Sequence, residues 1–213
     1  MYELFKVSVK HSAEAALSPD GFALRADAGA VWDLASNGDP IAGGARPPGV
    51  ALGWTSTDAA GLPVFPGLAT YYEAGVLGVI RHALRFTVQR SRAAYLYPPA
   101  THYASADAGA SLPPMGMRLR LRASFNCTAA LPAAPQARAV CVALQVHGMM
   151  LADNGGDGAI SGLADPRWDD ADLAQLRRIP LSLFDAVETG ATLCTDPACS
   201  NADVSGGAVG SFA

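Results

Sequence analysis

The alternation of side chains in residues 79–88 constrains the fold of this chain more than any other feature. One set is mainly apolar and the other mainly polar or small: Ile80, His82, Leu84, Phe86 and Val88 against Arg81, Ala83, Arg85 and Thr87. Successive side chains of a strand point to opposite faces of a sheet, so the pattern predicts a strand with one buried and one solvated face. Such strands are typical of antiparallel sheets.

A second alternating segment, residues 115–125, carries Arg118, Arg120 and Arg122 on one side. We interpret this arginine row as a solvated strand face, with a bound polyanion as the minor alternative. Between residues 135 and 148 the apolar spacing becomes helical. We therefore expect a helix near 136–147, and a further helical turn after Asp170, where acidic residues suit the positive end of a helix.

Frequent turn residues complete the fold prediction. The 213 residues include 22 Gly and 15 Pro, which separate short strand-like runs. We expect an all-β fold, with two packed antiparallel sheets of jelly-roll type, in which residues 149–153 and 159–161 form a hairpin. Residues 1–190 are expected to form this single domain, and the Gly-, Ser- and Ala-rich residues 191–213 a tail or linker with a small cysteine loop.

Charge and hydropathy argue against two kinds of partner. The chain has 15 Lys and Arg residues against 19 Asp and Glu residues, and its basic residues form no stripe of the kind that binds nucleic acid. It also lacks a window of about 20 apolar residues, so we expect no membrane span.

The first ten residues alternate like a strand and lack the apolar run of a secretory signal. We expect that a segment upstream of Met1 is missing and that residues 2–9 form a strand without its hairpin partner. The open edge of such a strand accepts a strand from another copy of the chain or from the upstream segment. In the alternative interpretation, Lys6 and Lys10 prevent this pairing and the chain is a monomer.

Four cysteines form two local pairs, Cys127 with Cys141 and Cys194 with Cys199, and none has the spacing of a zinc site. We favour two disulfides over four reduced thiols. Disulfides persist in oxidising compartments, so we expect an extracellular or cell-surface location. Asn126-Cys127-Thr128 is in addition a sequon for N-glycosylation, which is used only in a secretory pathway.

Two carboxylates are the candidates for acid–base catalysis. Asp153 and Asp165 flank the predicted hairpin, and glycoside hydrolysis needs two carboxylates about 5 to 9.5 Å apart. Both acids also suit ordinary turns, an alternative that stays open. His82 and His102 are the candidate histidines, although a core position is the simpler interpretation of His82.

Trp168 is the best candidate for ligand binding, together with Arg167, Tyr103 and Asn154, because a flat ring beside polar groups can stack on a sugar. No histidine pair has metal-ligand spacing, and no glycine-rich motif has the strand–helix context of a nucleotide site. We therefore expect neither a metal nor a cofactor.

Several strings follow one another in a fixed order along residues 1–190. They are YELF (2–5), AVWDLASN (30–37), GWTSTDAAGLP (53–63), IRHALRFT (80–87), LPPMG (112–116), LADNG (151–155) and SGLADPRWD (161–169). As a set they resemble a family of secreted, uncharacterised β-rich proteins. The resemblance implies an extracellular β-rich domain, and it brings no established activity and no catalytic residues.

Two classes of function fit these observations. The first is an extracellular, non-enzymatic module, either a structural component of a cell surface or matrix or a glycan-binding domain, with a glycan or other copies of itself as partner. The alternative is a carbohydrate-active enzyme, a glycoside hydrolase or lyase, that uses the Asp and His candidates on a concave sheet face. Whether the protein is an enzyme stays open at this point.

Overall fold

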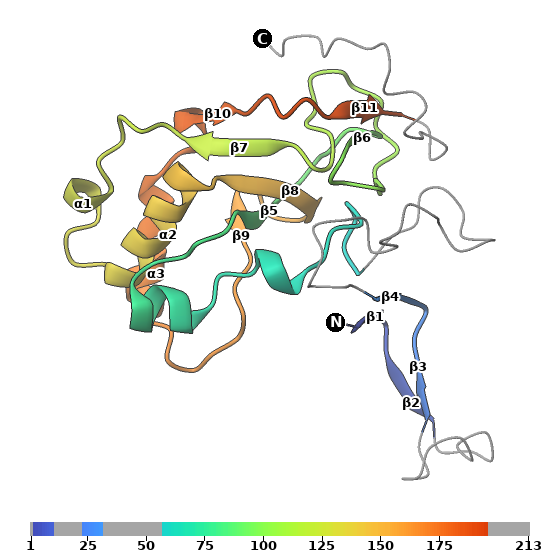
Figure 1. Ribbon diagram of the computed structural model, residues 1–213, viewed down its shortest axis with the longest axis horizontal. Helices are drawn as coiled ribbons and strands as arrows, with labels where there is room; N and C mark the ends of the chain where they lie inside the picture. The colour runs from blue at the N-terminus through green and yellow to red at the C-terminus, as the bar shows by residue number, and fades with distance from the viewer. Residues whose placement is uncertain (1, 11–22, 32–56, 196–213) are drawn as a thin grey trace.

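The computed structural model describes residues 2–10, 23–31 and 57–195 (Figure 1). In this part of the chain the central element is a five-stranded sheet with the order β10-β7-β8-β5-β9. Its strands are β5 (Leu84–Val88), β7 (Arg118–Leu121), β8 (Met149–Asn154), β9 (Ala159–Ile160) and β10 (Phe184–Ala186).

The prediction of an all-β sandwich is wrong, because this sheet is mixed and helices cover one of its faces. Strand β5 is parallel to β8, with Leu84 opposite Met149 and Phe86 opposite Leu151. The predicted hairpin of 149–153 and 159–161 is also wrong, since β9 pairs with β5 instead of β8. Alternation along one strand reports which face is buried, and a mixed sheet with one covered face gives the same pattern as a sandwich.

Helix α2 (Pro135–Val146) confirms the helix expected near 136–147. Pro135 stands in its first turn, where the missing N–H is no loss. Its end is fixed by Gly148, which has a φ of 74°. A Cβ at this glycine would lie 2.4 Å from the Leu119 carbonyl oxygen, so only glycine lets the chain turn this close to β7.

Charged side chains from other elements cap both ends of α2. At the N-terminus the buried Asp172 accepts hydrogen bonds from the N–H groups of Gln136 (2.9 Å) and Ala137 (2.8 Å). At the C-terminus the guanidinium groups of Arg118 and Arg120 donate to the carbonyl oxygens of His147 and Gln145. Negative charge at the first turn and positive charge at the last both oppose the helix dipole and stabilise α2.

The remaining helical segments are short. They are η2 (Phe65–Gly67), η3 (Tyr72–Leu77), α1 (Cys127–Ala130), α3 (Asp170–Leu173), η4 (Ala174–Arg178) and η5 (Leu181–Leu183). Helix α3 confirms the helical turn expected after Asp170, and the Asp169 carboxylate accepts from the N–H groups of Ala171 and Asp172. Within the described residues, no helix is long and apolar enough to cross a membrane.

The N-terminal strands pair within the chain. β1 (Tyr2–Phe5) is antiparallel to β4 (Ala28–Val31), and β2 (Ser8–Lys10) to β3 (Ala23–Arg25). The expectation that residues 2–9 lack a partner strand is therefore wrong. The partner strands lie about 20 residues further along the chain. At that separation the sequence has no short hairpin turn from which the pairing could be recognised.

One buried carboxylate attaches β1 to the main body. Glu3 accepts hydrogen bonds from the backbone N–H of Val64 (2.6 Å) and from the Thr57 hydroxyl (3.3 Å). Another small sheet joins β6 (Tyr95–Tyr97) to β11 (Thr192–Cys194), so the first residues of the predicted tail form a strand.

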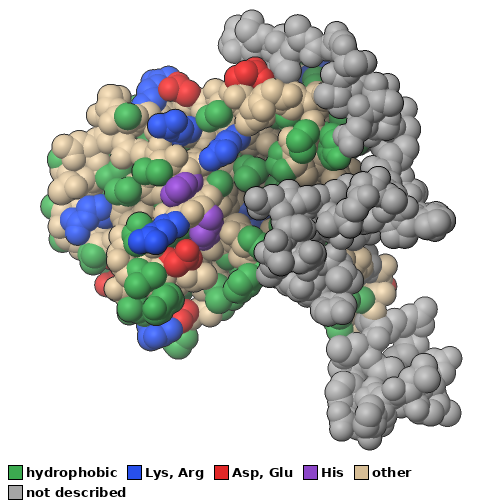
Figure 2. Space-filling model, viewed as in Figure 1, with side chains coloured by type: hydrophobic (Ala, Val, Ile, Leu, Met, Phe, Trp, Pro, Cys, Tyr) green, Lys and Arg blue, Asp and Glu red, His purple; other side chains and the backbone are tan. Residues whose placement is uncertain are grey.

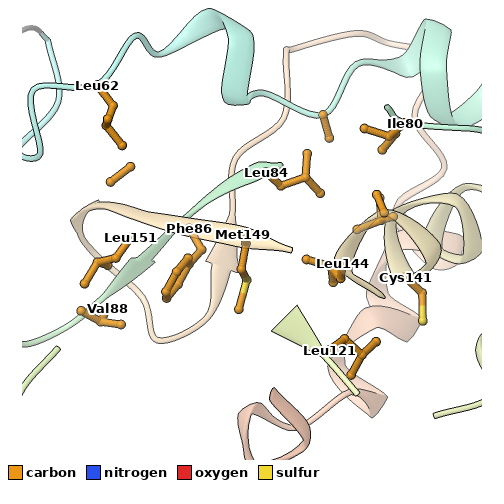
Figure 3. Packing of buried hydrophobic residues seen from close by; sticks show 14 of the residues in the cluster. Leu62, Ile80, Leu84, Phe86, Val88, Leu121, Cys141, Leu144, Met149 and Leu151 are labelled. Carbon is orange, nitrogen blue, oxygen red and sulfur yellow. The ribbon is translucent and has the colours of Figure 1, made fainter. Parts of the chain in front are cut away.

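The hydrophobic core lies between the five-stranded sheet and α2. Figure 3 shows side chains of β5, β7, β8 and α2 gathered in this space, among them Phe86, Leu121, Leu144 and Met149. Each of these four side chains is at most 2% exposed. Burial of this kind is the main stabilising term of a domain of this size.

The Cys127–Cys141 disulfide is confirmed, and it ties α1 to α2 with a Cα–Cα distance of 5.9 Å. The other predicted pair, Cys194 with Cys199, includes a residue outside the described part of the chain.

Candidate functional site

A groove of about 630 Å³ opens on the helical side of the sheet. We call it the apolar groove. Its floor consists of Val140 and Leu144 of α2 and Met149 of β8, and Leu173 and Leu176 of α3 and η4 form a wall. Apart from three charged residues, the side chains that line it are hydrophobic. Its volume is in the range of pockets that hold small organic ligands.

The lip of the apolar groove is hydrophobic and exposed. Leu163 is 41% exposed and Leu181 is 40% exposed. Large apolar side chains that stay in water around a concave site are a feature of ligand and partner surfaces. The open groove therefore leaves apolar surface that a ligand can bury.

Trp168 lines the apolar groove, and its neighbours hold it in place. Its indole N–H donates to the Leu163 carbonyl oxygen at 2.9 Å, and its ring meets the Tyr71 ring edge to face at a centroid distance of 5.7 Å. The Arg167 guanidinium lies over the same Tyr71 ring, 4.4 Å from its centroid. Of the predicted ligand-binding residues, Trp168 lines the groove, whereas Arg167 packs on the same Tyr71 ring without lining the groove.

Asp165 holds Arg167 in this position. The Arg167 Nε and Nη2 atoms donate to the two carboxylate oxygens of Asp165 at 2.8 and 2.6 Å. This bidentate pair lowers the pKa of Asp165 to about 2. Asp165 is therefore a permanent anion paired with arginine at neutral pH, which is unsuited to the role of a general acid.

Three charged residues line the apolar groove, namely Asp157, Asp170 and Arg177. All three are exposed. Asp157 accepts a hydrogen bond from the Gln89 N–H at 2.8 Å, which holds its carboxylate at the turn before β9. The floor of the groove carries no charge. Charged contacts in the groove are therefore limited to these three exposed side chains.

The two predicted histidines do not line the apolar groove. His82 lies just before β5, where its Nε2 is 3.2 Å from a Glu73 carboxylate oxygen and its Nδ1 is 2.9 Å from the Ala83 carbonyl oxygen. The His102 Nδ1 is 3.0 Å from the Ala59 carbonyl oxygen. The Tyr103 ring stacks on both His102 and Tyr95, away from the groove.

Asp153 and Asn154 lie at the far end of β8, and neither lines the apolar groove. The Asp153 carboxylate accepts from the next N–H in the chain, that of Asn154, at 2.8 Å. The Asn154 amide bonds to the Ser91 hydroxyl and to the Val88 carbonyl oxygen, so it joins β8 to the chain after β5. Asp153 thus makes a local turn contact of the kind that its sequence suggested, whereas Asn154 makes long-range contacts that the sequence did not indicate.

The most perturbed carboxyl group in the described part of the chain, that of Asp58, was not among the residues predicted from the sequence. Asp58 is 3% exposed, and burial raises its pKa to about 7 against the opposing effect of Arg85. One Asp58 oxygen accepts from the N–H groups of Ala60 and Leu62, and the other from Arg85 Nη2 at 3.3 Å. Arg85 donates also to the Ser161 hydroxyl at 2.8 Å.

This buried cluster holds the chain around residues 58–62 against β5. A turn at Asp58 was visible in the sequence, and so was the polar side of β5. Their contact was not, because the two residues are 27 positions apart and nothing local relates them.

The arginine row has partners within the protein. Arg118 and Arg120 cap α2, and Arg122 pairs with Asp185 of β10 at 2.9 Å. Figure 2 shows acidic side chains among the basic ones on the visible face. A polyanion site needs basic groups that are free to bind, so these contacts weigh against the polyanion alternative.

No group of three or more His, Cys, Asp or Glu side chains in the described part of the chain is arranged to hold a metal ion. Comparison with family models, with curated proteins and with solved structures finds no match to this chain.

Proposed function

We propose that this chain is an extracellular, non-enzymatic binding module whose apolar groove holds a small apolar ligand. The observation that carries the proposal is the combination of an uncharged, buried floor with an exposed hydrophobic lip. Burial of apolar surface contributes about 25 cal/mol for each Å² removed from water. A groove of this kind therefore gains most from a ligand with an alkyl chain or a fused ring.

The extracellular part of the proposal is supported by the Cys127–Cys141 disulfide. Disulfides of this kind are rare in reducing compartments. A glycan is a less suitable ligand for this groove than an apolar molecule. Sugar hydroxyls lose their hydrogen bonds to water on a hydrophobic floor, which costs free energy unless protein groups replace them.

The enzymatic alternative has less support. Its two acids, Asp153 and Asp165, are bound to a backbone N–H and to an arginine, and neither lines the apolar groove. Catalysis of glycoside hydrolysis requires both carboxyl groups at one substrate-binding surface.

Titration with the neutral dye Nile red, which fluoresces in apolar surroundings, tests this proposal. We expect saturable 1:1 binding that weakens at least tenfold in Ala164→Trp, since Ala164 lines the groove and an indole there fills it. Ala174→Trp is the matched control, because Ala174 is exposed on η4 and does not line the groove. Equal affinity of the two variants, or no saturable binding to the wild type, would contradict the proposal.

A further inference from the structure

The sequon Asn126-Cys127-Thr128, the only one in the sequence, lies at the start of α1. Figure 1 places α1 at the outer end of the main body, on the connection from β7 to α2. Asn126 and Thr128 are both exposed, and so are the small residues Ala123, Ser124 and Ala129 around them. A large group attached to Asn126 has open space in front of it.

The two atoms of the Asn126 amide have different surroundings. Its Oδ1 accepts a hydrogen bond from the Ala129 N–H at 3.0 Å and so caps α1. Among the contacts of the described residues, its Nδ2 has no hydrogen-bond partner. A glycan is attached to Nδ2 and leaves the carbonyl oxygen in place. Modification is therefore compatible with the cap, and α1 keeps its hydrogen bond.

The middle residue of the sequon belongs to the disulfide. Cys127 is 4% exposed and bonded to Cys141 of α2. Once this bond has closed, the backbone of the sequon is held at the start of a helix and against a second helix. An acceptor peptide must move into the active site of a transferase, and a segment fixed in this way cannot do so.

We propose that Asn126 is an N-glycosylation site and that glycan transfer precedes closure of the Cys127–Cys141 disulfide. The donor is a lipid-diphosphate-linked oligosaccharide of a secretory pathway. The Nδ2 atom forms a bond to C1 of the first sugar while the bond from C1 to the phosphate oxygen breaks. The lipid diphosphate leaves with the electron pair, and the proton lost from Nδ2 passes to a base of the transferase.

The presence of a disulfide supports the same compartment, because glycan transfer and disulfide formation both take place in the secretory pathway. The two reactions then compete for one tripeptide. This inference is independent of the apolar groove, which α1 does not line.

The test is secretion of the full chain from a eukaryotic host, followed by enzymatic deglycosylation in ¹⁸O water and peptide mass spectrometry. Conversion of Asn126 to ¹⁸O-labelled Asp is expected in the wild type and in Thr128→Ser, and its loss to background in Thr128→Ala. Thr128→Ala keeps the Asn126 cap, so its fold is a matched control. An unlabelled wild type, in a host that glycosylates a reporter sequon, would overturn the site.

A separate variant tests the order of the two reactions. Cys141→Ser keeps the sequon intact and removes only the disulfide partner of Cys127. We expect a larger labelled fraction at Asn126 in Cys141→Ser than in the wild type. An equal or smaller fraction would show that the disulfide does not limit transfer, and would overturn the proposed order.

Discussion

The two faces of β5 differ in how they are covered. On one face Leu84 and Phe86 are buried between the sheet and the helices, in the core that borders the apolar groove. On the other face Arg85 bonds to Asp58 and Ser161, and the chain around Gly67 lies against its Cβ. One face is closed by a polar network, and the other is left with an opening whose floor is uncharged and hydrophobic.

The comparison shows where binding is to be expected. On the closed face both Asp58 oxygens and two of the three Arg85 guanidinium nitrogens already have partners, and among the described residues only the buried Arg85 Nε lacks one. A buried ion pair bonded in this way offers little to a ligand. An apolar groove is stable when open and becomes more stable when a ligand removes its surface from water.

The largest effect is expected for Arg85→Leu. At pH 8 this variant leaves the Asp58 carboxylate buried without its cation, and we expect a loss of roughly 3 to 5 kcal/mol in the free energy of unfolding. The loss should be smaller at pH 5, where Asp58 is protonated. Urea denaturation at the two pH values measures both. Arg81→Leu is the control, because Arg81 is exposed just before β5; an equal loss there would contradict the account.

The second prediction concerns pH. The folded state raises the pKa of Asp58 from 3.8 to about 7, so between these values it binds more protons than the unfolded state. The stability from this group is therefore fully present below pH 4, falls as the pH rises, and is lost above pH 7. Each pKa unit corresponds to about 1.4 kcal/mol. We expect Asp58→Asn to flatten this slope in urea denaturation; an unchanged slope would assign it to another group.

Removal of the disulfide ranks third. Cys127 and Cys141 are 14 residues apart, and opening a loop of this size costs about 3 kcal/mol. Thermal unfolding of the double variant Cys127→Ala/Cys141→Ala, beside the wild type, measures the loss. A melting temperature equal to that of the wild type would show that the bridge does not restrict the unfolded chain.

The smallest effect is expected at the N-terminus of α2. Asp172→Ala removes the acceptor of two backbone N–H groups, and loss of a cap costs about 1 kcal/mol. Because α2 forms the groove floor, Nile red should also bind more weakly. For stability the control is Asp170→Ala in the same short helix, whose side chain is exposed. Nile red binding is compared with the wild type alone, because Asp170 lines the groove. A larger loss of stability in the control would contradict the assigned role of Asp172.

Local features of the fold were predictable, and the relations between distant segments were not. Helix α2 and the Cys127–Cys141 bridge follow from spacing over fewer than 20 residues. The parallel pairing of β5 with β8 joins segments about 65 residues apart, and alternation contains no information on the direction of a partner strand. The alternating segments 79–88 and 115–125 each contain a strand, but only over Leu84–Val88 and Arg118–Leu121, and the pattern led to the wrong sheet.

The candidate site shows the same limit. Trp168 was predicted from a flat ring beside polar neighbours, and it lines the apolar groove, whereas Arg167 packs on the neighbouring Tyr71 ring outside the lining. The floor of the groove was not predictable, because Val140, Leu144 and Met149 have the spacing of ordinary core residues. The groove exists because no further side chain fills the space above these three residues. That is a property of the packing, and it leaves no pattern in the sequence.

The central claim, that the apolar groove binds an apolar ligand, is tested most directly by the affinities of a series of 1-alkanols, measured by displacement of Nile red. Each methylene buried in the groove contributes about 0.8 kcal/mol, so affinity should rise about fourfold per carbon until the groove is full. In Ala164→Trp the rise should stop at a shorter chain, and in Ala174→Trp it should match the wild type. An affinity that does not depend on chain length, or that depends on it equally in both variants, would contradict the claim.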